Sequence, residues 1–180
     1  MLKIMLALLL FGQNIVQKDI DRTKESALDA LVATYHFGDV KFNVSPPLKL
    51  FDILDAGHIL NFTSFDGQYS HGGIMPEGGI EVFIRFRDTE VAKSIPNIIG
   101  EKSRFSKITS RSEINVQGQR AIRAVYENDY VVFREVVTAV YFERNNKIYE
   151  FSATVYRGDR KRKELTNVFE KLVQSISFVD

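Results

Sequence analysis

Residues 131–156, VVFREVVTAVYFERNNKIYEFSATVY, decide how the rest of the chain is interpreted. Two runs within them, residues 131–142 and 148–156, are rich in β-branched and aromatic residues, the composition typical of β-strands. Between the runs lie Asn145 and Asn146, which can adopt the positive φ angles that a tight turn requires. The stretch therefore predicts a long antiparallel β-hairpin.

Strand patterns continue toward the N-terminus. Residues 80–87, IEVFIRFR, alternate apolar and charged side chains apart from Phe83, which indicates a strand with one covered face. Gln117 and Gly118 form a turn signal between two further strand patterns. Strands are also expected at residues 40–44, 59–65, 108–116 and 120–126.

Helical patterns are fewer. Residues 91–103 are weakly helical and are interrupted by Pro96. A final helix is expected to begin near Asp159, a residue type that caps helix N-termini, and its apolar stripe includes Leu165, Phe169 and Leu172. This order of elements predicts an α+β fold in which an antiparallel β-sheet is flanked by helices.

The composition limits the classes of function. A chain of 180 residues has the length of one domain. Its 24 Lys and Arg residues nearly balance its 23 Asp and Glu residues, so the net charge is +1. No overall field favours a nucleic acid, and none is expected as a partner. The absence of Cys excludes disulfide scaffolds, zinc ribbons and thiol nucleophiles.

The N-terminus has the layout of a sorting signal. Residues 1–11, MLKIMLALLLF, contain one Lys and a short apolar run, as secretory signals do. The run is too short for a membrane span, which needs about 20 apolar residues. Residues 1–17 are expected to be a signal peptide or an uncleaved signal anchor. The protein is therefore expected to be exported, to the periplasm or the extracellular space, and to be membrane-tethered if the signal stays attached. Residues 18–37 are expected to form a helical spacer with His36 at its end, and residues 38–180 one domain.

Four segments of that domain resemble the PsbP-like superfamily, and the resemblance spans residues 42–180. They are FNVSPP at 42–47, VQG at 116–118 with the strand after it, FERNNKIY at 142–149, and the final helix running into SISF at 175–178. The superfamily includes the extrinsic PsbP proteins of photosystem II, a Ran-binding nuclear-import factor and many exported bacterial proteins of unknown role. The resemblance implies an α/β/α sandwich and a non-catalytic role in binding or assembly with a protein partner.

Two segments are candidate binding sites. Residues 67–79 form a glycine-rich loop whose paired glycines can direct backbone amides at an anion. The second candidate is a basic run whose charge opposes the dipole of the final helix and suits anionic lipid headgroups, a polyanionic envelope polymer or an acidic protein face. A flexible connector and a solvated surface are the respective alternatives. The candidate residues are His71, Gly72, Gly73, Glu77, Gly78 and Gly79 in the loop, and Arg157, Arg160, Lys161, Arg162 and Lys163 in the basic run.

The sequence contains no catalytic or metal-binding spacing. Ser70 and His71 are adjacent but lack a nucleophile-elbow motif. His58, His71 and Glu77 lack the spacing of a metal motif, and the glycine loop matches no nucleotide-binding motif. We therefore expect no catalytic residues, no metal, no cofactor and no enzymatic activity.

Two functions remain open. The first is an exported, non-catalytic domain that binds a protein partner or assists an envelope or membrane-associated complex, with an anionic membrane or envelope surface as a second candidate partner. The alternative is an exported small-molecule or lipid carrier, or an unrecognised enzyme. In that alternative the glycine loop closes over a pocket lined by Phe62, Phe83 and Phe86.

Overall fold

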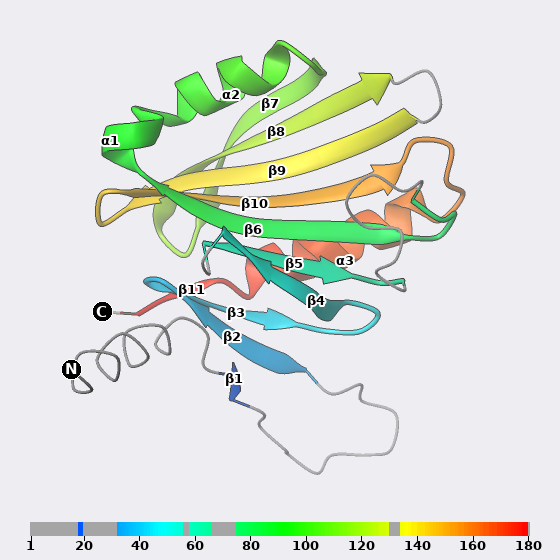
Figure 1. Ribbon diagram of the computed structural model, residues 1–180, viewed down its shortest axis with the longest axis horizontal. Helices are drawn as coiled ribbons and strands as arrows, with labels where there is room; N and C mark the ends of the chain where they lie inside the picture. Colours follow the sequence, from blue (N-terminus) through cyan, green and yellow to red (C-terminus); the bar gives the residue numbers. More distant parts are fainter. Residues whose placement is uncertain (1–17, 20–31, 56–57, 66–74, 130–133, 180) are drawn as a thin grey trace, which may run out of the picture.

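The computed structural model describes residues 18–19, 32–55, 58–65, 75–129 and 134–179, which form two antiparallel sheets and three helices (Figure 1). Within these residues the larger sheet has seven strands in the order β4-β5-β6-β10-β9-β8-β7. Its strands are β4 (Lys49–Leu54), β5 (Ile59–Thr63), β6 (Ile80–Asp88), β7 (Lys107–Val116), β8 (Gln119–Asp129), β9 (Arg134–Arg144) and β10 (Lys147–Tyr156).

The smaller sheet and the helices cover the larger sheet. In chain order the smaller sheet consists of β1 (Lys18–Asp19), β2 (Ala33–Phe37), β3 (Val40–Val44) and β11 (Ser177–Phe178). The helices are α1 (Thr89–Ala92), α2 (Ile95–Ser103) and α3 (Arg162–Gln174). Figure 1 shows α1 and α2 on one side of the larger sheet, with α3 and the smaller sheet on the other. The predicted antiparallel sheet flanked by helices is confirmed.

The predicted hairpin is the centre of the larger sheet. Strands β9 and β10 pair from Arg144 opposite Lys147 to Glu135 opposite Tyr156. Asn145 and Asn146 have φ angles of 47° and 59°, as a two-residue hairpin turn requires. Residues 131–133, which belong to the predicted first run, lie outside the described residues.

Two hydrophobic cores lie on opposite faces of the larger sheet. The main core combines the sheet with α3 and the smaller sheet, and aromatic rings join its layers. The ring of Phe42 in β3 lies 5.5 Å from that of Phe151 in β10 and 6.1 Å from that of Phe62 in β5. On the opposite face, Ile98 and Ile99 of α2 are buried with residues of β8, β9 and β10.

The structure corrects the predicted helical spacer. Residues 33–37 are strand β2, which pairs with β3 and buries Tyr35 and Phe37 in the main core, and Lys18–Asp19 pairs with β2. The domain therefore begins before residue 38, and His36 lies in a strand, not at a helix end. ATYHF contains β-favouring residues, and its pairing with β3 makes it a strand rather than the end of a helix. Residues 20–31 lie outside the described residues.

Two helix predictions also need correction, and one strand was missed. The helical pattern at 91–103 breaks at Lys93 and Ser94, while Pro96 lies in the first turn of α2, where proline is tolerated. The strand β4 was not predicted. The helix α3 starts at Arg162 with Lys161 at the N-cap position, so Asp159 does not cap it.

Among the described residues, no helix is both long and apolar enough to cross a membrane.

Candidate functional site

Asp159 brings the two sequence-predicted binding segments together. Asp159 is buried, and its carboxylate accepts hydrogen bonds from the backbone amide of Gly78 and from that of Lys161, the latter at 2.7 Å. The C-terminal end of the glycine loop is therefore fixed against the segment that leads into α3. Glu77 is exposed beside this junction and Gly79 is buried. His71, Gly72 and Gly73 lie outside the described residues.

The basic run divides into a paired residue and an exposed group. Arg157 lies 3.3 Å from Glu127 and 3.2 Å from Asp129, so its charge is already balanced by carboxylates of β8. Arg160, Lys161, Arg162 and Lys163, hereafter the basic turn, are all exposed. Within the part of the chain that the structure describes, none of these four side chains forms an ion pair.

The carrier pocket expected from three phenylalanines is not formed by them. Phe62 and Phe86 face the main core. The ring of Phe62 meets that of Tyr35 edge to face, with 5.0 Å between the ring centres, and the ring centre of Phe86 lies 5.7 Å from that of Tyr149. Phe83 lies between buried Val82 and Ile84 on β6 and therefore points to the opposite face. Strand alternation separates these side chains, and other aromatic rings fill the space around Phe62 and Phe86.

A buried charge cluster lies between α2 and the larger sheet. The Glu150 side chain on β10 is 3% exposed and accepts hydrogen bonds from Arg85 of β6 at 2.8 Å and from Lys102 of α2. The ammonium of Lys102 also lies 5.7 Å and 5.6 Å from the ring centres of Tyr126 and Tyr141. Favourable cation–π contacts at these distances add to the ion pairs.

The electrostatics of this cluster keep Glu150 charged. Burial alone would raise the pKa of the Glu150 carboxyl, but the charges and hydrogen bonds of Lys102 and Arg85 outweigh burial and hold this pKa below its usual value. Burial also raises the pKa of Tyr141, whose hydroxyl lies 3.2 Å from that of Tyr126. Every charge in the cluster has an internal partner, so the cluster fastens α2 to the sheet.

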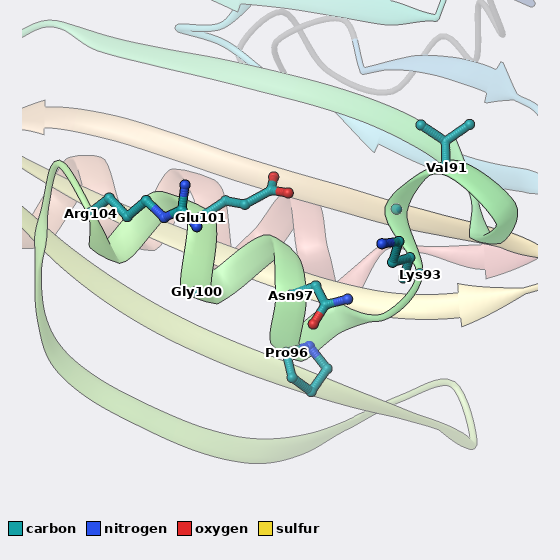
Figure 2. A pocket seen from close by; sticks show the side chains of 8 residues that line it. Val91, Lys93, Pro96, Asn97, Gly100, Glu101 and Arg104 are labelled. Carbon is teal, nitrogen blue, oxygen red and sulfur yellow. The ribbon is translucent and has the colours of Figure 1, made fainter.

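Helices α1 and α2 and the turn between them line a groove of about 490 Å³, here called the α1–α2 groove (Figure 2). Figure 2 shows Pro96, Asn97, Gly100, Glu101 and Arg104 along α2, with Val91 on α1 and Lys93 on the turn that joins the two helices. The groove is lined by Val91, Ala92, Lys93, Pro96, Asn97, Gly100, Glu101 and Arg104.

A strained turn shapes one wall of the groove. Lys93 has φ 61° and ψ −54°, and the amide of Ser94 donates to the carbonyl of Ala92 at 2.7 Å across it. This is a γ-turn with positive φ, a rare conformation for a residue with a side chain. Such strain costs about 1–3 kcal/mol and clusters at functional sites.

The groove combines apolar and cationic groups. Val91 is 77% exposed, and Phe105, directly after Arg104, is 80% exposed. Glu101 lies 3.7 Å from Arg87 and is thereby paired, whereas Lys93 and Arg104 form no ion pair within the described residues. The surface can therefore accept a partner that offers apolar side chains together with carboxylates.

Sequence reasoning missed this groove. Its only local signals are the small residues Pro96 and Gly100, four positions apart on one helix, and the apolar Val91 and Phe105 at the two ends of the pattern. The hollow itself depends on the turn at Lys93, which no propensity predicts. Among the residues that the structure describes, no three His, Asp or Glu side chains are placed to hold a metal ion.

Comparison with known proteins identifies the fold. No protein-family profile and no curated protein matches the sequence. The solution structure of cyanobacterial PsbP (CyanoP) from Synechocystis sp. PCC 6803 matches with a TM-score of 0.52 at 11% identity, covering 87% of this chain and 97% of that one. The Saccharomyces cerevisiae Ran-binding protein Mog1p matches with a TM-score of 0.51 at 11% identity, covering 79% and 92%.

A crystal structure from Bacteroides thetaiotaomicron matches with a TM-score of 0.51 at 12% identity over 79% of this chain, which spans 46% of that longer protein. At these identities the likeness concerns the fold alone. The chain has the PsbP-like fold that PsbP and Mog1p share, and the resemblance seen in the sequence is confirmed at this level.

Proposed function

We propose that this chain is a non-catalytic binding domain whose α1–α2 groove docks an acidic segment of a protein partner. The observation that carries the proposal is the combination of exposed Val91 and Phe105 with two cations, Lys93 and Arg104, that form no ion pair within the described residues. Interfaces typically place apolar anchors at their centre and charges at the rim, where charge complementarity selects the partner.

The fold supports this proposal by analogy. Mog1p is a Ran-binding protein, so one protein with this fold binds another protein. A shared fold does not transfer a function, and the partner of this chain is to be identified from its own surface. The buried cluster around Glu150 supports a binding role for the other side of α2, because it makes that helix a rigid support for the groove.

Site-specific crosslinking tests the proposal. A photo-crosslinking amino acid at Asn97, within the groove, is expected to capture one protein through an acidic peptide in the cells that make this chain. The same amino acid at Lys49, exposed on β4 at the far edge of the larger sheet, serves as the control. The double variant Lys93→Glu, Arg104→Glu is expected to weaken binding of the purified partner by about tenfold or more.

Two results would contradict the proposal. One is equal crosslinking from positions 97 and 49, which would indicate chance encounters. The other is unchanged affinity of the double variant for the purified partner. A thermal melt of the double variant excludes unfolding as the cause of lost binding, since both side chains are exposed.

We further propose that the domain is exported and assists an envelope or membrane-associated complex. The layout of residues 1–17 supports export. Residues 1–20 fused to a reporter enzyme that is active only outside the cytoplasm are expected to give activity, and replacing the apolar run by charged residues should abolish it. A reporter that stays inactive with the unaltered segment would refute export.

A further inference from the structure

The basic turn is a second charged surface, separate from the groove. Its four side chains follow one another along the chain and all are exposed. The carboxylate of Asp159 faces inward, where it is held by the amides of Gly78 and Lys161. Two exposed acidic residues lie near the basic turn: Glu164 follows it in the chain, and Glu77 precedes Gly78, whose amide is bound to Asp159. The four positive charges outnumber these two acids.

These cations do not stabilise α3. They precede or occupy its first turn, where the positive end of the helix dipole disfavours cations and favours acids. A binding role is one reason to keep charge in an unfavourable place, because local rules are typically broken at functional positions.

The basic turn contains charge without apolar anchors. The large hydrophobic side chains that are exposed among the described residues are Val32, Phe51, Ile53, Val91, Phe105 and Val179. None of them belongs to residues 157–163, in contrast to the groove, which is lined by Val91 and by Arg104, the residue before Phe105. A protein interface usually needs such anchors, whereas a layer of anionic headgroups attracts clustered Lys and Arg by charge alone.

We propose that the basic turn binds the anionic surface of a lipid bilayer. Each Lys or Arg held near such a surface strengthens binding by about fivefold, so two of them contribute about 25-fold if their effects are additive. The groove lies on α1 and α2, whereas the basic turn lies at the start of α3, and Figure 1 shows these helices on opposite sides of the larger sheet. A bilayer bound at one surface therefore leaves the other open to a protein.

Vesicle co-sedimentation of the full chain tests this inference. The measured quantity is the ratio of partitioning into vesicles of equal parts phosphatidylcholine and phosphatidylglycerol to partitioning into pure phosphatidylcholine. Any contribution of the apolar N-terminal run enters both partition coefficients and largely cancels. The wild type is expected to prefer the anionic vesicles at low salt and to lose the preference at high salt.

Two double variants separate local from overall charge. Arg160→Glu, Lys163→Glu and Lys93→Glu, Arg104→Glu each lower the net charge from +1 to −3, since every reversal subtracts two charges. The first is expected to reduce the ratio at least about 25-fold, and the second to reduce it far less. The first variant should melt no earlier than the wild type, because acids favour the first turn of a helix.

Three outcomes would overturn the inference. They are a wild type without preference for anionic vesicles, equal losses in both variants, and binding of polyglutamate without binding of vesicles. The last would assign the basic turn to an acidic protein. Failure here leaves the crosslinking result at position 97 unaffected, so the two proposals stand or fall separately.

Discussion

Glu150 stays ionised inside the protein because two cations reach it from different elements, Arg85 from β6 and Lys102 from α2. Its folded-state pKa lies below its usual value, so its ionisation stabilises the fold fully above the unfolded-state pKa of about 4.3. This stability is lost as the pH falls through the folded-state pKa.

Glu150→Gln is therefore expected to flatten the loss of stability in acid. At neutral pH it should cost about 2–3 kcal/mol, below the usual range for a broken buried pair. The cost is reduced because the two cations are 25% and 26% exposed and can be hydrated. Urea unfolding between neutral pH and pH values below the carboxyl range measures both effects.

Glu113→Gln is the matched control for this experiment. Glu113 pairs with Arg120, but the side chains are 63% and 74% exposed, so solvent screens the pair. This variant is expected to leave the stability essentially unchanged at neutral pH. A Glu150→Gln protein that keeps the full acid dependence of the wild type would show that the buried pair is not its source.

At the scale of elements, local signals predicted the structure where turn chemistry and alternation agree. The hairpins at Asn145–Asn146 and Gln117–Gly118 formed as expected, and all four of these residues have the required positive φ angles. Residues 33–37 were expected to end a helix, but they pair with strand β3 and form a strand. Strand β4 lacked a clear signal because it starts two residues after Pro47 and its register shifts between Leu50 and Asp52.

The candidate sites likewise differ in whether a local sequence signal predicts them. That the basic turn is exposed follows from the sequence, since four consecutive cations are seldom buried. The groove depends on two short helices meeting at the γ-turn of Lys93, and the cluster under it joins residues as distant as Lys102 and Glu150. Such contacts have no local signature. The net charge of +1 likewise conceals that cations gather at one end of α3.

For the whole molecule, the aromatic layer of the main core joins the two sheets. Phe42 comes from the smaller sheet and contacts rings of the larger one, and it is fully buried. In the turn between β2 and β3, the amide of Asp39 donates to the hydroxyl of Tyr149 at 3.0 Å. The sheets should therefore unfold together, as one cooperative unit.

Phe42→Ala tests this cooperativity. The lost ring leaves a cavity between the sheets and is expected to cost about 3–5 kcal/mol, a large part of the about 5–15 kcal/mol that stabilises a typical domain. Because the chain has no Trp and 7 Tyr, tyrosine fluorescence can be followed beside far-ultraviolet circular dichroism during urea unfolding. Both transitions should shift together to lower urea. Phe105→Ala removes the same ring from a position that is 80% exposed and should shift neither. If the two probes separate in Phe42→Ala, the smaller sheet melts alone, and the larger sheet with its helices is an independent folding unit.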